Sequence, residues 1–273
     1  MSATSGPRAV GRPPFAAAWR LLLSGPGEPG FNMALDEALA LAVRRGWSPP
    51  TLRIYQWQQP AISLGCHQPL SVLEAFDEHA GGGAVVVRRP TGGGAVLHTR
   101  DVSYALVCDQ RTLRGQPSRF LYRQFHAALG LALGESGCRQ RRRHHLLRAS
   151  GRRQRYTMAR GRQGVASPVP AEALCFQQPV ANDLLQGRAK VAGAAQRRWR
   201  DGLLQQGTVV EPTLSRDRVA LCIRTAWDQV FNCHWTVGAL TVQERVLADE
   251  LWSKYRPWTP SSWLLGTRDA LSR

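Results

Sequence analysis

A glycine triplet between two apolar segments places the strongest constraint on what this chain can fold into. Residues 85–87 are three consecutive valines, Gly92, Gly93 and Gly94 follow, and a second apolar segment covers residues 102–108. Three glycines in a row allow unusual backbone angles and leave no Cβ between the main chain and whatever lies against it. The pattern predicts a strand, a glycine loop and a second strand.

Charged residues stand at both ends of this loop. Arg88 and Arg89 precede the glycines, and His98 follows them. From the residues alone, the loop either wraps a bound ligand or only turns the chain in a hairpin. It is not a phosphate-binding P-loop, because the required lysine and Ser/Thr are missing, and it is not the dinucleotide fingerprint, because no G-x-G-x-x-G opens a helix here.

The positive charge of the chain is concentrated in two segments. The formal net charge is +17 over 273 residues, but residues 136–171 contain ten arginines and no acidic residue, and the first 27 residues contain three arginines and no acidic residue. This leaves about +4 on the rest of the chain. Because clustered unpaired charge cannot enter a core, we predict a solvated loop or disordered insertion at 136–171, inside the folded part of the chain expected at 17–258. Tails are expected at 1–16 and 259–273.

An arginine-rich segment also raises nucleic-acid binding as a function of another class. Two observations argue against this function: the arginines are concentrated in one predicted loop, and no RNA-binding motif with aromatic residues accompanies them. The six cysteines include no C-x-x-C pair and follow no secretory signal, which favours a reducing compartment, here the cytoplasm. No apolar run approaches the ~20 residues that span a membrane, so no membrane association is expected.

The order of the expected elements favours an α/β or α+β fold. Strands are predicted at 52–57 and 61–65, and helices at 71–79 and 118–133, after a first strand near residue 18 and a helix over 31–43. Strands that alternate with helices, with hairpins among them, are typical of a sheet with helices packed on one side.

A second block of interest contains one of only two lysines in the chain. Residues 183–186 and 190–192 predict a hairpin that turns at Gly187, with Lys190 on its second strand and Cys175 before its first. A nearby ammonium lowers the pKa of a cysteine, so Cys175 and Lys190 are reasonable candidates for a nucleophile and its activator. A buried structural cysteine is the commoner explanation of such a residue.

The run Arg-Arg-Pro-Thr-Gly-Gly-Gly-Ala-Val-Leu-His, residues 88–98, closely resembles the signature of the lipoate-protein ligase and octanoyltransferase family. The segment Asn-Met-Ala-Leu-Asp-Glu at 32–37 is similar to the family's first helix. The resemblance implies a single biotin/lipoate ligase-like catalytic domain with mixed sheets and flanking helices. It also implies that the glycine loop lies along a bound acyl chain.

The second block resembles the octanoyltransferases of the Bacillus type. Cys175-Phe176 with Pro179 matches their Cys-Phe-x-x-Pro, and Lys190 with residues 191–197 matches their closing motif, with one extra residue between Gly187 and Lys190. The resemblance implies that Cys175 carries the acyl group as a thioester and that Lys190 assists it. Gly92, Gly93, Gly94, Gly193 and Ala194 would then line the acyl site, with Arg88, Arg89 and His98 at its mouth.

The implied activity is octanoyl transfer from acyl carrier protein to a lysine of apo lipoyl domains, in the glycine cleavage H protein or E2 subunits, without metal, ATP or other cofactor. Lipoate ligases, which use ATP, are the first alternative, although they lack the Cys-Phe-x-x-Pro motif. An amidotransferase that moves octanoate between lipoyl proteins is the second. Two departures put efficiency in doubt, because Thr99 stands where the family commonly has aspartate and Gln206 where it usually has histidine.

Overall fold

The structure is a computed structural model that describes residues 18–76, 84–113, 115–144, 156–159, 179–231 and 235–258. Cys175, both expected tails and most of the arginine-rich segment lie outside the described residues. The predicted domain boundaries therefore stay predictions.

Two sheets form the framework of the described part of the chain. The larger sheet has eight strands in the order β11-β1-β2-β6-β10-β9-β8-β7, and the smaller has three in the order β4-β3-β5. Both are mixed. In the larger sheet β1 runs parallel to β2, while β2, β6, β10 and β9 are successively antiparallel. In the smaller sheet β3 is parallel to β4 and antiparallel to β5. The strands are β1 (Trp19–Gly27), β2 (Thr51–Trp57), β3 (Ala61–Leu64), β4 (Val85–Arg88), β5 (Val96–His98), β6 (Val102–Asp109), β7 (Tyr156–Met158), β8 (Leu184–Gln186), β9 (Ala189–Arg198), β10 (Gly202–Val209) and β11 (Trp235–Val237).

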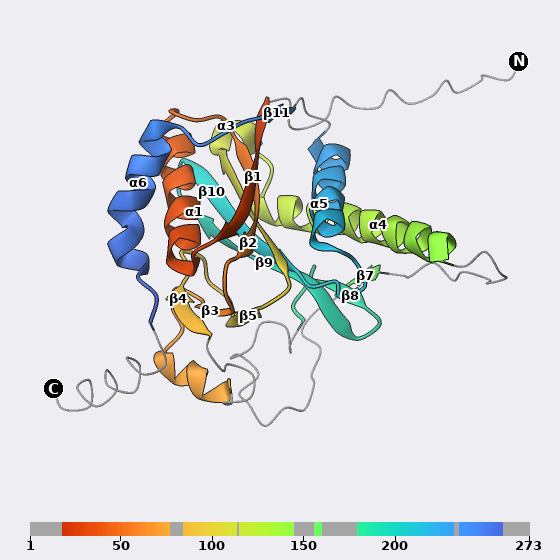
Figure 1. Cartoon of the computed structure of the whole chain (residues 1–273). Helices are drawn as coiled ribbons and strands as arrows, with labels where there is room; N and C mark the ends of the chain where they lie inside the picture. The colour runs from red at the N-terminus through yellow and green to blue at the C-terminus, as the bar shows by residue number, and fades with distance from the viewer. Residues whose placement is uncertain are drawn as a thin grey trace, which may run out of the picture.

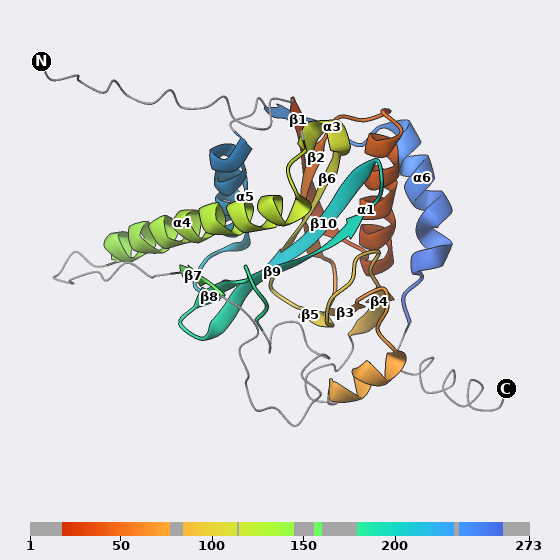
Figure 2. The same cartoon turned by 180° about the vertical axis from the view of Figure 1, so that it is seen from behind.

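Helices cover both faces of the larger sheet (Figure 1). Helices α1 and α6 lie on one face and α4 and α5 on the other, as the view from behind confirms (Figure 2). The α-helices are α1 (Pro29–Arg44), α3 (Gln110–Leu113), α4 (Ser118–His144), α5 (Arg216–Phe231) and α6 (Val242–Trp252), with 3-10 turns at Leu70–Ala75 and Ser253–Tyr255. The expectation of helices on one side only was wrong, because strands such as β6 are buried on both faces and leave no solvated face.

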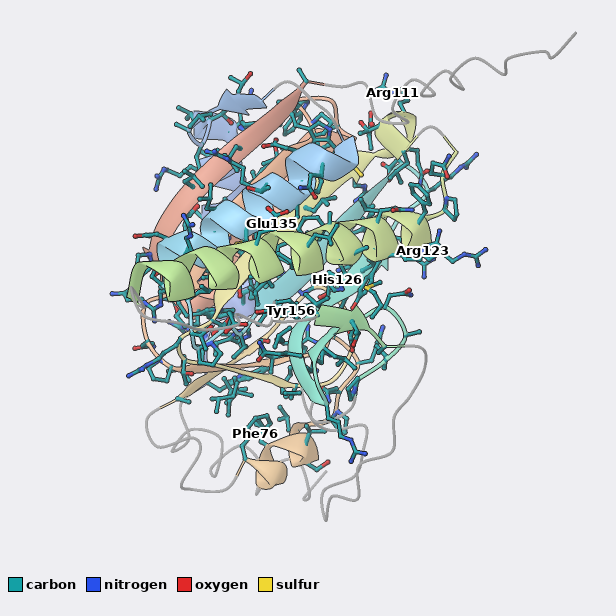
Figure 3. All side chains as sticks on the ribbon, turned by 90° about the vertical axis from the view of Figure 1, so that its right-hand side faces the viewer. Phe76, Arg111, Arg123, His126, Glu135 and Tyr156 are labelled. Carbon is teal, nitrogen blue, oxygen red and sulfur yellow. The ribbon has the colours of Figure 1, made fainter. Side chains whose placement is uncertain are left out.

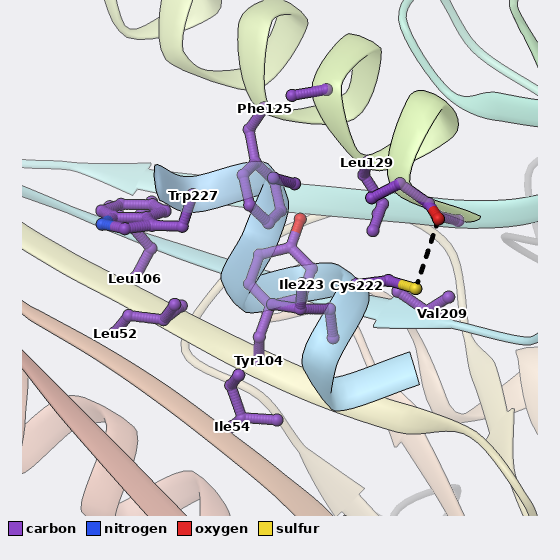
Figure 4. Packing of buried hydrophobic residues seen from close by; sticks show 14 of the residues in the cluster. Leu52, Ile54, Tyr104, Leu106, Phe125, Leu129, Val209, Cys222, Ile223 and Trp227 are labelled. Carbon is purple, nitrogen blue, oxygen red and sulfur yellow. Dashed lines mark hydrogen bonds between the residues drawn. The ribbon is translucent and has the colours of Figure 1, made fainter. Parts of the chain in front are cut away.

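Alternate residues of the central strands pack into two separate hydrophobic cores. Tyr104 and Leu106 of β6 pack under α4 and α5, where Phe125 and Trp227 meet edge to face at 5.7 Å (Figure 4). Ala105 and Val107 face the α1 side. The glycine loop at residues 92–94 lies on the α1 face of the larger sheet. Helix α4 covers the opposite face of this sheet.

Local signals explain how α1 and α6 begin. Glu28 caps α1 by accepting hydrogen bonds from the backbone amides of Gly30 and Phe31, and Pro29 occupies its first turn. Thr241 and Glu244 form a reciprocal capping box at the start of α6. Glu244 also pairs with Arg20 of β1, so this cap fastens α6 to the sheet.

Several predicted elements differ in extent from the observed ones. The helix expected over 71–79 is a 3-10 turn over 70–75, and residues 77–80 lie outside the described part. Residues 136–144 continue α4, and β7 pairs with β8, so the loop predicted for 136–171 was wrong at both places. The predicted hairpin over 183–192 is confirmed, with Gly187 at a φ of 61° in its turn. Within the described residues, no helix is both long and apolar enough to cross a membrane.

Candidate active site

A pocket opens between α1, the smaller sheet and the α1 face of the larger sheet. Its empty space is about 420 Å³, open solvent at its mouth included. Strands β9 and β10 form its floor through Gly193, Ala194 and Ala195 and through Gln206, Gly207 and Thr208. The remaining lining residues come from α1, β2, β3, β5, β6 and the glycine loop: Met33, Tyr55, Trp57, Ser63, Arg89, Val96, His98 and Ser103.

The glycine loop is shaped by Arg89. The guanidinium of this buried residue donates to the carbonyls of Gly92 at 2.6 Å and Gly94 at 2.8 Å, and to that of Ser63 at 2.8 Å. Gly93 has a φ of 87°, which favours glycine, and its carbonyl lies where a Cβ on Gly65 would be. Arg89 thus folds the loop against β3, and among the loop residues it is Arg89 rather than a glycine that lines the pocket.

His98 lies in the pocket wall. Its ring stacks on Trp57 with centroids 4.0 Å apart, its Nδ1 is 2.8 Å from a carboxylate oxygen of Asp101, and its Nε2 is 2.8 Å from the hydroxyl of Ser63. Burial acts to raise the pKa of Asp101, but the charge and hydrogen bond of His98 outweigh it and the pKa is lowered. Because Nδ1 faces a carboxylate, it carries the proton, and Nε2 accepts from Ser63 when the ring is neutral.

These positions correct two expectations. Arg89 and His98 are only 7 % and 3 % exposed, so they belong to the wall of the pocket and not to its mouth. Arg88 is half-buried and donates to the carbonyls of Gly65 and Gln68 outside the lining. The carboxylate that Thr99 cannot provide is provided to His98 by Asp101, whose other oxygen accepts from the Thr99 backbone amide.

Gln206 connects three elements at the pocket. Its amide nitrogen donates to Asp36 of α1 at 2.7 Å, and its carbonyl accepts from Thr91 of the glycine loop at 2.8 Å. Asp36 also contacts Arg53 at 2.7 Å, yet burial prevails and raises the pKa of this carboxyl. Gln206 therefore performs a bridging role that needs both a donor and an acceptor, which an amide supplies at any pH.

Lys190 lies beside the pocket. Its Nζ is 2.8 Å from Oδ2 of Asp183, and its side chain passes over Gly193, where a Cβ would overlap its Cε and Nζ. Tyr122 of α4 donates to Oδ1 of Asp183 at 2.7 Å, and the backbone amide of Val180 donates to Oδ2 at 2.7 Å. The result is an ammonium held in a buried position at the edge of the floor.

The predicted site residues therefore divide into three groups. Arg89, His98, Gly193 and Ala194 line one pocket, and Lys190 stands next to it. Gly92, Gly93, Gly94 and Arg88 shape the loop above the pocket. Cys175 lies outside the described residues, so its distance from Lys190 stays a prediction.

Sequence reasoning missed Asp101, Ser63 and Tyr122. Asp101 had a usable signal, since it is the carboxylate nearest to His98 in the chain. Ser63 and Tyr122 had none, because sheet pairing and helix docking bring them to the site from 35 and 61 residues away from their partners. Among the described residues, no group of three or more His, Cys, Asp or Glu side chains could hold a metal ion.

Two sheets that enclose a pocket beneath a glycine loop define a protein of the lipoate ligase fold. The protein Ta0514 of T. acidophilum, solved with bound lipoic acid, is similar with a TM-score of 0.64 at 21% identity, and covers 87% of this chain and 95% of its own. A lipoate-protein ligase A bound with ATP gives a TM-score of 0.62 at 20% identity over 87% and 95% of the two chains. At these identities the likeness concerns the fold alone.

Sequence comparison then gives the family. The model of the lipoyl protein ligase A/B catalytic domain matches residues 28–217, and the chain belongs to this family. The octanoyltransferase LipM of Kyrpidia tusciae is 30% identical over 277 residues, which cover 87% of this chain and 96% of the relative. The octanoyltransferase LipM of Moorella thermoacetica is 37% identical over 199 residues, which cover 71% and 66%.

Proposed function

We propose that this protein is an octanoyltransferase of lipoate biosynthesis that works through a thioester on Cys175. The observation that carries the proposal is the buried ammonium of Lys190 over Gly193, at the floor of a pocket in a chain whose curated relatives are octanoyltransferases. The acyl donor is octanoyl acyl carrier protein. The acceptors are lysines of apo lipoyl-domain proteins, namely the glycine cleavage H protein and E2 subunits, and the setting is the cytoplasm.

The reaction has two balanced steps. In the first, the Cys175 thiolate attacks the carbonyl carbon of the donor thioester, the bond to the carrier sulfur breaks, and the carrier leaves as a thiol with the proton that Cys175 lost. In the second, the amine of the acceptor lysine attacks the acyl-cysteine, an amide forms, and the proton released by the amine restores the Cys175 thiol. Both steps pass through a negatively charged tetrahedral species, which a fixed ammonium stabilises.

The pocket residues bind and orient the octanoyl chain. Apolar contact is available from Met33, Trp57 and Val96, and the small residues at Gly193, Ala194 and Ala195 keep the floor low enough for a chain to lie on it. Lys190 stands at the Gly193 end of this floor. We therefore orient the acyl carbonyl toward Gly193 and the remainder of the chain toward the α1 and β5 walls.

Intact-protein mass spectrometry tests the proposal directly. The protein and its Cys175→Ser variant are mixed with octanoyl acyl carrier protein in the absence of ATP. We expect the protein to gain one octanoyl mass that hydroxylamine removes, and the variant to gain none.

Two further arms separate the alternatives. Octanoylation of an apo lipoyl domain only after addition of ATP and a free acid, with no adduct on Cys175, would replace the proposal with a lipoate ligase. Acylation of Cys175 by an octanoylated H protein but not by octanoyl acyl carrier protein would make the protein an amidotransferase.

A further inference from the structure

The turn that contains Asp183, the carboxylate partner of Lys190, is hydrogen-bonded to helix α4 through two consecutive residues, Asn182 and Asp183. We propose that Tyr122 and His126 of α4 are positioning residues that hold Asn182 and Asp183, and through them fix the place of the Lys190 ammonium beside the pocket. This inference rests on the proposed octanoyl transfer for its effect on rate. It rests on contacts within the described residues for its effect on Lys190.

Tyr122 and His126 lie one helical turn apart and form one face of α4. Their ring centroids are 4.4 Å apart at 63°, and the side chain of His126 is fully buried. Figure 3 looks onto α4 and labels His126 on the side of the helix that faces β7 and β8. Residues spaced i and i+4 share a helix face, so one rigid element presents both groups to the same turn.

Tyr122 fastens the carboxylate. Its hydroxyl donates to Oδ1 of Asp183 at 2.7 Å and accepts from the backbone amide of Ala194 at 2.9 Å. Burial, followed by the Asp183 charge, raises the pKa of Tyr122 well above its ordinary value, so the hydroxyl keeps its proton and remains a donor. Because Ala194 lines the pocket, Tyr122 connects the partner of Lys190 directly to the pocket floor.

His126 fastens the preceding backbone. Its Nδ1 is 2.8 Å from the carbonyl oxygen of Asn182, and its Nε2 is 3.1 Å from the hydroxyl of Tyr104. A carbonyl only accepts, so Nδ1 carries the proton and Nε2 accepts from Tyr104. Burial lowers the pKa of His126 to about 4, which keeps this neutral tautomer in place at physiological pH.

Asn182 sets the direction of the turn. Its φ of 74° lies in the left-handed region, which asparagine adopts more readily than most residues with a side chain. The next residue is Asp183, whose Oδ2 accepts from the Val180 amide and contacts Lys190. A turn that relaxed at Asn182 would therefore move the carboxylate away from Lys190. In the sequence, Cys175 precedes Val180 by five residues, so the same turn ends the segment of the proposed nucleophile.

The chain contains its own matched control. Tyr255 donates to Glu37 at 2.6 Å, and Glu37 contacts Lys254, so Tyr255→Phe removes the same kind of hydrogen bond from a carboxylate that does not line the pocket. We compare Tyr122→Phe with Tyr255→Phe in the full chain, and His126→Asn, whose amide can replace the Nδ1 donor, with His126→Leu, which cannot.

The first readout is steady-state octanoyl transfer from octanoyl acyl carrier protein to an apo H protein. We expect kcat to fall about 10- to 100-fold in Tyr122→Phe, the range for loss of a hydrogen bond to a charged group, with a smaller change in KM for the donor because the Tyr122 side chain does not itself line the pocket. Tyr255→Phe should keep the kcat of the wild type, and His126→Asn should retain more activity than His126→Leu.

The second readout does not depend on acyl transfer. Lys190 and Lys254 are the only lysines of the chain, and their side chains are 1% and 51% exposed. Acetylation by an N-hydroxysuccinimide ester, followed by peptide mass spectrometry, reports how well each is held. Tyr122→Phe should speed the labelling of Lys190 relative to Lys254, and Tyr255→Phe should not.

The two readouts separate the outcomes. A kcat equal to that of the wild type in Tyr122→Phe, equal losses in Tyr122→Phe and Tyr255→Phe, or indistinguishable His126→Asn and His126→Leu would each overturn the positioning role. A wild-type protein that transfers no octanoyl group would overturn the proposed function, while the labelling ratio would still decide whether Tyr122 holds Lys190.

Discussion

The only two lysines of the chain occupy the same three-part arrangement in two different surroundings. In each, a tyrosine hydroxyl and a lysine ammonium share one carboxylate. The first set is Tyr122, Asp183 and Lys190, with distances of 2.7 and 2.8 Å, and the second is Tyr255, Glu37 and Lys254, with distances of 2.6 and 2.6 Å.

The two sets differ in the burial of the lysine side chain. The Lys190 and Asp183 side chains are 1% and 0% exposed, whereas the Lys254 side chain is 51% exposed and that of Glu37 is 8% exposed. Water can replace a partner of Lys254 but not one of Lys190, so the same contacts become obligatory in one place and dispensable in the other. We interpret the Lys190 set as part of the active site. The Lys254 set holds the 3-10 turn at Ser253–Tyr255 against α1.

The largest expected effect is on stability when each carboxylate loses its charge. Asp183→Asn should lower the free energy of unfolding by about 3–5 kcal/mol, as one-sided removal of a buried pair does. Glu37→Gln should cost less, because Lys254 is half in solvent and the glutamine carbonyl can still accept from Tyr255. Urea denaturation followed by fluorescence measures both, and equal losses in the two variants would remove the contrast.

The next effect is on catalysis when each lysine becomes arginine. A planar guanidinium is bulkier than an ammonium and cannot occupy the space over Gly193 in the same way. We expect Lys190→Arg to reduce kcat by about 100-fold, the scale of losing one oxyanion-stabilising donor. Lys254→Arg should stay within about twofold of the wild-type rate, since the Lys254 side chain is 51% exposed and does not line the pocket. Similar rates for the two variants would argue against a catalytic role for Lys190.

The sequence predicted this contrast only in part. The rarity of lysine drew attention to Lys190, and the hairpin over residues 183–192 was predicted from its glycine turn and short apolar runs. The family signature pointed to Arg89 and His98 as residues of the acyl site, and both line the pocket. These are features that neighbouring residues determine, so a linear pattern records them.

The remaining parts depend on tertiary packing. Tyr122 reaches Asp183 only because α4 docks on the sheet, and nothing in the sequence of α4 marks that residue. The expected position of His98 at the pocket mouth failed because pairing of β5 with β3 places its ring between Trp57 and Ser63. The arginines at 136–144 suggested a loop, but the backbone of α4 continues through them, in keeping with the high helix propensity of arginine.

A smaller effect is expected when a methyl group is placed beneath Lys190. The Cβ of Gly193→Ala would overlap the Lys190 side chain and must displace it, so we expect kcat to fall about tenfold, near 1.4 kcal/mol. Gly25→Ala is the control, because a Cβ at Gly25 has no atom within 4 Å. Full activity in Gly193→Ala would mean that the position of Lys190 over Gly193 does not matter to the rate.

The smallest effect distinguishes the two sets by their response to acid. His126 packs against Tyr122 of the Lys190 set, and burial lowers its pKa from 6.5 to about 4. Within the described residues, Glu37 of the Lys254 set accepts from Arg197, Lys254 and Tyr255 and from no histidine. A histidine with a lowered folded pKa costs nothing above the unfolded pKa, and stability is lost as pH falls from about 6.5 toward about 4, because only the unfolded chain takes up the proton.

We therefore expect the free energy of unfolding to decrease by about 1 kcal/mol between pH 7 and pH 5.5, and this decrease to be absent in His126→Asn. Urea titrations of both proteins at the two pH values measure it. Equal decreases of the free energy of unfolding in the two proteins would assign the acid response to other groups. The Lys190 set would then differ from the Lys254 set only in the burial of its lysine.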